Sequence, residues 1–268
     1  MFTILSQTIM MESVLVPNDK VSNYVKNIFL LENDCADDKE VSLPFFADGY
    51  PGIMFHISKE GVFLQPANKK LASIFLYGQT IHPIELSIKG SYRLIIFQLF
   101  PFAAKMLLGV DPKELNDDCF DLNLLDQDIK LLLEQLNTAK KADKQIEIIS
   151  SFIERLIDLS NDNIDSTIQS AINIIISHKG KITIKDLREK LHITERTFER
   201  LFVNQVGVNP QQFTKIIQFQ NSLEQLSRED YSLLTDIVFE NGFTDQSHFI
   251  RTFKKYTGKT PTEFQKTP

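Results

Sequence analysis

The sequence predicts an α+β protein. We expect an N-terminal β-rich domain, a sandwich or a small barrel, followed by helices, and then an all-α C-terminal domain with two helix-turn-helix units. Three observations predict this. Short apolar runs alternate with turn residues over residues 41–100, apolar residues recur every three or four positions after Pro101, and a twenty-residue segment near the C-terminus occurs twice. With 268 residues, 43% hydrophobic and 24% charged, the chain is long enough for one large core or two smaller ones.

The first domain begins with expected strands. Apolar runs at residues 52–58, 72–77 and 92–97 are separated by short segments that contain glycine or proline. No helical pattern of crossover length lies between them, so the sheet should be largely antiparallel.

Two amphipathic helices should follow the strands. Apolar residues at residues 129–136 and 146–157 have the helical period and are joined by the polar stretch 137–144. Their apolar stripes must pack either on the sheet or on another copy of the chain. We therefore predict dimerisation through residues 126–159.

The polar stretch 160–165 is the expected domain boundary, which gives domains of residues 1–164 and 165–268. The net charge of −6 is distributed unevenly between these two domains. Residues 165–268 carry 14 basic and 12 acidic side chains, whereas residues 1–164 carry 15 and 23. The second domain is mildly basic, as a nucleic-acid-binding module attached to an acidic domain would be.

In the repeat, residues 194–213 align with residues 245–264, which lie 51 positions later. Six of the twenty positions are identical, where chance would give roughly one or two. The identical pairs are Phe198 with Phe249, Arg200 with Arg251, Phe202 with Phe253, Gly207 with Gly258, Pro210 with Pro261, and Phe213 with Phe264.

Each copy predicts a helix, a tight turn and a second, capped helix. In the first copy Thr194 caps the second helix and Gly207 ends it. In the second copy Thr244 or Asp245 caps the helix and Gly258 ends it. The phenylalanines form the buried stripe, and the polar residues of the second helices face outward. The candidate DNA-binding residues are Arg196, Thr197, Glu199, Arg200, Gln246, Ser247, His248, Arg251, Lys254 and Lys255.

Those residue types suit base reading, since arginine pairs with guanine and glutamine with adenine. Alternative roles stay open for several of them. Arg200 and Arg251 can instead buttress their helices through carboxylates, and Lys254 and Lys255 also suit a helix C-terminus. Between the units, residues 211–226 predict one helix of about 24 Å, long enough to hold two recognition helices in successive major-groove segments roughly 34 Å apart.

The run from Asn241 to Phe264 resembles the family stretch of AraC-type (AraC/XylS) transcriptional regulators. The resemblance covers about 100 residues, 166–266, and is weaker in the first unit. It implies a seven-helix DNA-binding domain whose two recognition helices enter the major groove. The N-terminal half is similar only in arrangement, a β-rich sensing or dimerising domain followed by helices.

The sequence departs from the family pattern in both units. Arg188 and Val238 replace a small alanine between the paired helices, so the packing there should be looser or rearranged. The connecting helix carries Gln218 for arginine and Ser222 for alanine. Glu195 and Glu199 add carboxylates to the first recognition helix, from which we infer that the second unit binds DNA more strongly.

These observations favour a sequence-specific transcriptional regulator without catalytic activity, cofactor or metal. The expected partners are double-stranded promoter DNA, a small-molecule effector sensed by the N-terminal domain, a second copy of the chain and, for an activator, RNA polymerase. The sequence does not say whether transcription rises or falls. Three other classes remain as alternatives: a helical bundle that binds protein, a DNA-organising protein without sequence preference, and a small-molecule-binding protein or enzyme. The last would use polar residues of the β domain, which are His56, Tyr77, Gln79, His82 and Arg93.

The expected location is the cytoplasm, with no membrane partner. Lys20 is the first basic residue, so the N-terminus lacks the basic segment of a secretory signal. The longest near-apolar run, 94–104, is far shorter than the ~20 residues of a membrane span. Cys35 and Cys119 lie too far apart in sequence, and without neighbouring ligands, to indicate a disulfide framework or a zinc site.

Overall fold

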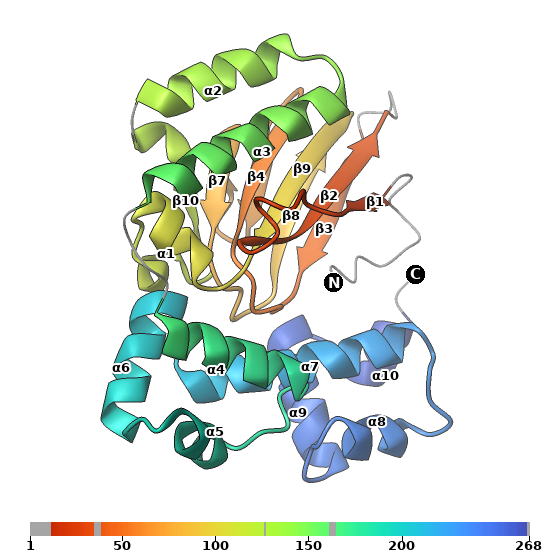
Figure 1. Ribbon diagram of the computed structural model, residues 1–268. Coiled ribbons are helices and arrows are strands. Elements are labelled where there is room, and N and C mark those ends of the chain that lie inside the picture. Colours follow the sequence, from red (N-terminus) through yellow and green to blue (C-terminus); the bar gives the residue numbers. More distant parts are fainter. Residues whose placement is uncertain (1–11, 35–38, 126, 161–164, 267–268) are drawn as a thin grey trace.

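The computed structural model describes residues 12–34, 39–125, 127–160 and 165–266. Cys35 and residues 161–164 of the expected boundary lie outside these residues. We call the part from the first strand to residue 160 the β domain and the part from residue 165 the helical domain. Together they have the predicted α+β architecture (Figure 1).

The β domain contains two antiparallel sheets, so the sandwich alternative is the correct one. The larger sheet has the order β1-β2-β9-β4-β7-β10 and the smaller sheet the order β3-β8-β5-β6. The strands are β1 (Glu12–Leu15), β2 (Val25–Asn33), β3 (Glu40–Phe45), β4 (Gly52–Ser58), β5 (Val62–Gln65), β6 (Lys69–Lys70), β7 (Ile74–Tyr77), β8 (Ile84–Lys89), β9 (Tyr92–Leu99) and β10 (Cys119–Asp121).

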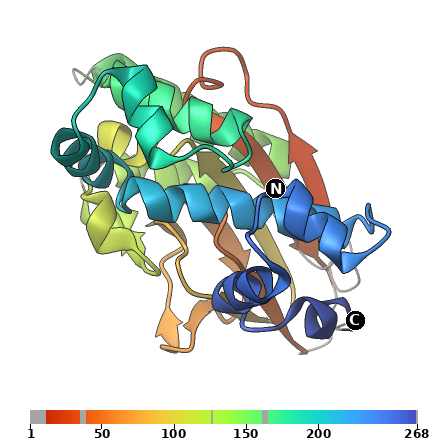
Figure 2. The same cartoon turned by 90° about the horizontal axis from the view of Figure 1, so that it is seen from below.

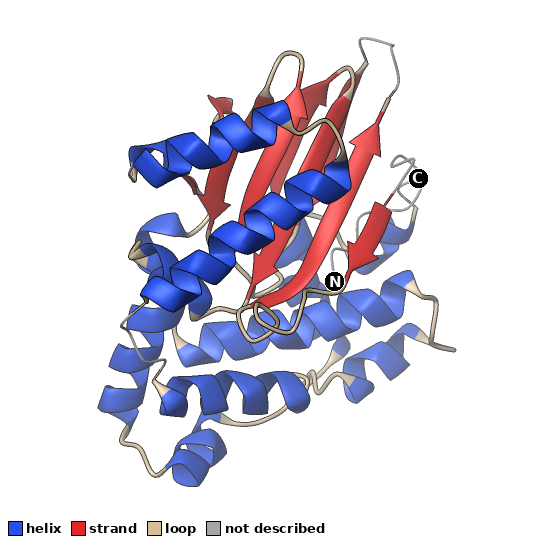
Figure 3. Cartoon of the chain, turned by 45° about the horizontal axis from the view of Figure 1, so that its top comes forward, coloured by secondary structure: helices blue, strands red, loops and turns tan. Residues whose placement is uncertain are grey.

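The larger sheet is buried on both faces, which explains the continuous apolar run of β9. Leu94 and Ile96 pack with the smaller sheet, whereas Ile95 and Phe97 belong to the core beneath the helices. A strand covered on one face only would alternate apolar with polar residues. The β domain therefore has three layers: the smaller sheet, the larger sheet and a layer of helices (Figure 3).

The helical layer consists of α1 (Ala103–Leu108), α2 (Gln127–Thr138) and α3 (Ala142–Leu159). Two 3-10 helices, η1 (Pro112–Leu115) and η2 (Leu122–Leu124), connect α1 to α2 on either side of β10. The inward residues of α2 and α3 are Ile129, Leu132, Leu136, Ile149, Phe152 and Ile153, and all are buried in one core with the larger sheet. The stripes that suggested a dimer are thus covered mainly by the sheet of the same chain, and Leu131, at 56% exposure, is an outward-facing apolar residue within the predicted range 129–136.

The described part of the helical domain has the seven helices that the resemblance implies. They are α4 (Ser166–Ser177), α5 (Ile184–Leu191), α6 (Glu195–Val206), α7 (Pro210–Ser227), α8 (Leu234–Glu240), α9 (Gln246–Thr257) and α10 (Pro261–Gln265). The connecting helix α7 extends one residue beyond the predicted range at each end. Its start is fixed by Asn209, whose side chain accepts from the backbone N–H of Gln212, and by Pro210 in the first turn.

The two domains share a hydrophobic core. The core beneath the larger sheet continues through α4, α5 and α6 to Phe213 and Ile217 of α7. A second cluster joins α7, α8, α9 and α10 and also contains Ala47 from the loop between β3 and β4. Figure 2 shows α7 running beneath the sheets, with α8, α9 and α10 toward one of its ends.

Candidate DNA interface

The first helix-turn-helix unit, α5 and α6, forms as its sequence predicts. Leu187, Phe198 and Phe202 are fully buried and hold the two helices together. The Thr194 hydroxyl oxygen accepts a hydrogen bond from the backbone N–H of Thr197 at 3.4 Å, so Thr194 caps α6. Gly207 ends α6 in the left-handed region, at φ 88°.

The second unit, α8 and α9, repeats this construction. Phe249 and Phe253 are fully buried, and Phe243 from the turn packs against Phe249 with ring centroids 5.1 Å apart. Of the two caps that the sequence allowed, Asp245 is the one used, because its Oδ1 accepts from the backbone N–H of His248 at 2.7 Å. Gly258 ends α9 at φ 77°.

All ten candidate DNA-binding residues lie on α6 or α9, and eight of them are exposed. Thr197 and His248 are half-buried because each has a structural partner. The Thr194 hydroxyl donates to Oγ1 of Thr197 at 2.9 Å, and the His248 ring packs edge-on against Phe243 at 5.5 Å. In Figure 1 both helices lie in the lower half of the molecule, α6 at the left edge and α9 near the middle. The polar faces of both second helices are therefore accessible.

The arginines of the repeat have no structural ion pair within the described chain. Neither Arg200 nor Arg251 lies within ion-pair distance of a carboxylate among the residues described. The alternative in which they buttress their helices through carboxylates therefore gains no support. Lys255 differs, because its Nζ lies 5.0 Å from the centroid of the Tyr256 ring.

The two residues that replace the family's small alanine, Arg188 and Val238, are accommodated in different ways. Val238 is 1% exposed and adds to the core of the second unit. Arg188 is half-buried between α5 and α6, and its guanidinium pairs with the Glu195 carboxylate at 2.8 Å. This pair offsets one of the two carboxylates on the first recognition helix, and the expectation of looser or rearranged packing in the two units stays a prediction.

One of the two polar departures on α7, Gln218, braces the second unit. Gln218 is buried, and its Nε2 donates to the carbonyl oxygen of Asn241, in the turn after α8, at 2.8 Å. Ser222 is fully buried and donates to the Phe219 carbonyl at 2.6 Å. The connecting helix is therefore tied directly to the turn that precedes α9.

Four of the five polar residues of the β domain have their own local contacts in the structure. Three of them have local partners: His56 with the Ala72 carbonyl, His82 with Asp117, and Arg93 with Glu32. The Gln79 side chain donates to the Gly49 carbonyl at 3.0 Å, and the Tyr77 hydroxyl is buried. Apolar side chains of both sheets pack against one another in the space between the sheets.

Sequence reasoning missed a buried carboxylate between the two domains. Asp48 is 7% exposed; its carboxylate accepts from the Tyr50 backbone N–H at 2.9 Å and from Gln98 Nε2 at 2.7 Å. Burial raises the pKa of Asp48, and burial lowers the pKa of Lys26 nearby. A hollow of about 120 Å³ beside Asp48 reaches α7. In the sequence, the loop between β3 and β4 has the pattern of an ordinary turn. Its packing on α7 is what places the Asp48 carboxylate between the two domains.

Family models match two parts of the chain. A model described as a helix-turn-helix domain matches residues 187–267, and a model of a domain of unknown function matches residues 13–121. The part that the structure describes contains no helix long and apolar enough to cross a membrane.

Curated relatives match part of this chain. An uncharacterized HTH-type transcriptional regulator of Staphylococcus aureus (strain MSSA476) is 29% identical over 84 residues, which is 31% of this chain and 11% of the relative. The HTH-type transcriptional activator RhaS of Yersinia pseudotuberculosis is 25% identical over 150 residues, 52% of this chain and 55% of the relative. The chain thus spans between about a tenth and about half of the length of these relatives.

Among solved structures, ToxT from Vibrio cholerae O395 is similar over 88% of this chain and 96% of its own, with 14% sequence identity and a TM-score of 0.48. The AraC-like transcriptional activator CuxR is similar over 84% of this chain and 90% of its own, with 13% identity and a TM-score of 0.28.

Proposed function

We propose that this chain, which carries a helix-turn-helix domain of the AraC type at its C-terminus, is a sequence-specific DNA-binding transcriptional regulator. The helices α6 and α9 enter successive major-groove segments on one side of promoter DNA. One observation carries the proposal: two capped helices on one connecting helix leave arginine, glutamine and serine side chains exposed on their outer faces. At 18 residues, α7 is about 27 Å long, a length that suits this spacing.

The test uses the full chain and a pool of duplexes selected for binding. Phosphate contacts make log K fall steeply with log salt, so affinity that ignores salt would contradict the proposal. Replacing Arg251→Ala should weaken a selected site by about 1 to 3 kcal/mol if the side chain reads a base. An equal loss on random DNA would make it a phosphate contact. Arg228→Ala is the matched control, because Arg228 is exposed but lies outside both recognition helices.

The β domain is proposed to sense a small-molecule effector. The shared core of the two domains supports this, because a ligand that shifts the packing of the sheets also acts on α6 and α7. Metabolites that raise the melting temperature of the full chain should then change its affinity for a selected site. Ligand binding that leaves DNA affinity unchanged would favour the alternative of a small-molecule-binding protein.

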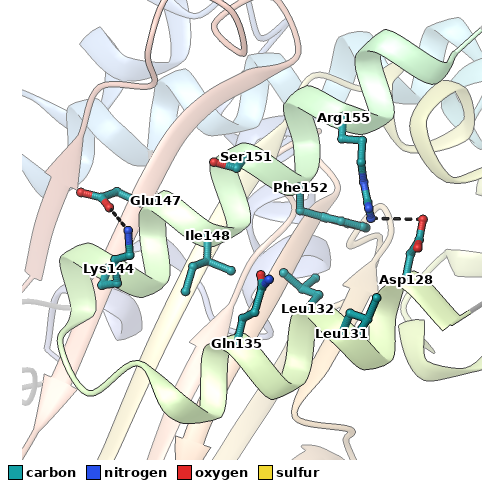
Figure 4. A pocket seen from close by; sticks show the side chains of 10 residues that line it. All are labelled: Asp128, Leu131, Leu132, Gln135, Lys144, Glu147, Ile148, Ser151, Phe152 and Arg155. Atoms are coloured by element: carbon teal, nitrogen blue, oxygen red, sulfur yellow. Dashed lines mark hydrogen bonds and ion pairs between the residues drawn. The ribbon is translucent and has the colours of Figure 1, made fainter.

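A second copy of the chain is the proposed partner of the groove between α2 and α3. Leu131 and Ile148 contribute apolar surface to this groove (Figure 4). An ion pair lies at each end of the groove, Arg155 with Asp128 at 3.2 Å and Lys144 with Glu147 at 2.8 Å. Each end therefore carries one positive and one negative charge. A surface with this pattern can be complementary to itself across a two-fold axis.

Sedimentation tests the dimer. Leu131→Asp should convert dimers into monomers while the melting temperature stays close to that of the original chain, because Leu131 is 56% exposed. The control Leu159→Asp changes a similarly exposed leucine, at 63%, that does not line the groove. A chain that is monomeric at micromolar concentration before any substitution would refute this proposal.

We further propose that the protein acts in the cytoplasm, where promoter DNA is found, and that it activates transcription through contact with RNA polymerase. The activator named among its relatives supports the direction of the effect. A reporter gene placed behind a selected site tests it. Higher expression in cells that contain the protein is the expected result, and lower expression would make the protein a repressor.

A further inference from the structure

The β domain holds the C-terminal end of α6 through backbone and side-chain contacts. Asn116 Nδ2 donates to the Gly207 carbonyl at 3.0 Å. Lys105 Nζ donates to the carbonyl and the side-chain oxygen of Asn204, at 3.1 and 2.8 Å. Gly207 lies so close to η1 that a Cβ on it would be 2.5 Å from the Pro112 carbonyl oxygen. The Asn116 bond and the close approach of Pro112 therefore hold η1 beside α6, and Lys105 holds the preceding helix α1 there as well.

This docking forms a groove between η1 and the first recognition helix. The groove has a volume of about 580 Å³. Its η1 side is Lys113, and its α6 side is Glu195, Arg196, Glu199, Arg200 and Val203. The spacing of the α6 residues puts them on one face of the helix, which includes three of the four residues expected to contact DNA in this unit. A side chain of the β domain thus lies beside the face that would meet DNA.

The groove favours an anion. The Glu195 carboxylate is paired with Arg188, so the cations Lys113, Arg196 and Arg200 stand against the single free carboxylate of Glu199. Lys113 is exposed, and its ammonium has no hydrogen bond or ion pair with the described residues. An unpaired ammonium on a short, docked 3-10 helix is available to a ligand.

When α6 enters the major groove of DNA, the anion that lies beside the groove between η1 and α6 is the DNA backbone. An α-helix with its side chains is about 10–12 Å across and fills the major groove, which is about 12 Å wide. The phosphates of the two strands therefore lie along the flanks of an inserted helix, and η1 lies along one flank of α6. From this placement we infer that the groove between η1 and α6 accepts one DNA backbone strand and that Lys113 donates to a phosphate.

The inference rests on the proposed function and extends it to the β domain. A phosphate contact adds affinity without sequence preference. It also makes the docking of the two domains part of the DNA interface, because Lys113 stands beside α6 only while η1 is held there.

The experiment measures DNA affinity of the full chain by fluorescence anisotropy over a series of salt concentrations. In Lys113→Ala the slope of log K against log salt should be less steep by about 0.9, the value for one lost phosphate contact. The affinity loss at low salt should be equal for selected and random duplexes. Lys113→Arg should keep the original slope, since it retains the charge.

Lys130→Ala is the matched control. Lys130 is an exposed lysine of α2, and Figure 1 shows the helix α2 at the opposite end of the molecule from α6. Removing the Lys130 charge should leave the slope unchanged. A Lys113→Ala variant with the original slope overturns the inference, and so does one that binds more tightly, because η1 would then obstruct DNA. Absence of salt-dependent binding by the original chain would instead refute the proposed function. Melting temperatures establish that each variant is folded.

Discussion

The docking of α6 on the β domain can be tested with the two glycines that end the recognition helices. Gly207 and Gly258 have similar left-handed conformations, with φ of 88° and 77°. An alanine in this region costs about 1–2 kcal/mol, so both Gly207→Ala and Gly258→Ala should lose roughly this amount. Their surroundings differ. A Cβ at Gly258 would lie 3.7 Å from Pro83 Cγ, an ordinary contact, whereas one at Gly207 would be 2.5 Å from the Pro112 carbonyl oxygen.

The Gly207→Ala variant must therefore move η1 away from α6. That movement breaks the hydrogen bond from Asn116, which follows η1 directly, an interaction worth about 1 kcal/mol. Gly207→Ala should lose about 2 to 3 kcal/mol of unfolding free energy, about 1 kcal/mol more than Gly258→Ala. For a chain of this size such a difference corresponds to a melting temperature lower by roughly 2–4 °C. Urea denaturation and thermal melting measure it, and equal losses in the two variants would refute the reasoning.

Two further predictions concern buried polar groups. Because burial raises the pKa of Asp48, the folded chain keeps this proton at a pH where the unfolded chain has lost it, so the carboxyl weakens folding progressively as pH rises above about 4. Relative to the original chain, Asp48→Asn should therefore gain stability between pH 4 and pH 7, and urea titrations that give a constant difference over this range would contradict the assignment. Gln218→Ala leaves the buried Asn241 carbonyl without its donor and should cost about 1–3 kcal/mol, whereas Gln211→Ala, at an exposed position of the same helix, should cost little. Equal melting temperatures for these two variants would show that the brace between α7 and the second unit adds no stability.

The local structure could be predicted from the sequence because its causes are local. Capping residues, glycine positions and apolar period gave both helix-turn-helix units, and α7 differs from its expected range by one residue at each end. The choice between sandwich and barrel stayed open, because strand order depends on pairing between distant strands such as β2 and β9. For the same reason the sequence did not say which surface covers the stripes of α2 and α3.

The part of the candidate site that was missed arises from contacts between distant residues. Asn116 and Gly207 are 91 positions apart, and no sequence pattern marks them as partners. Lys113 looks like any exposed lysine in a connection, and Asp48 like any turn residue. Each acquires its environment only when the helical domain packs against the β domain. The roles of the ten residues on α6 and α9 in DNA binding stay a prediction.

The core that continues from the larger sheet into α4, α5, α6 and α7 has a thermodynamic consequence. Residues such as Phe213 and Ile217 lose much of their apolar surroundings if the sheets melt, so neither half has a complete interior without the other. Heat should therefore unfold the molecule in one cooperative transition, visible as a single calorimetric peak, and not in two steps. Anything that stabilises the sheets then also stabilises α6, which shares their core, against unfolding.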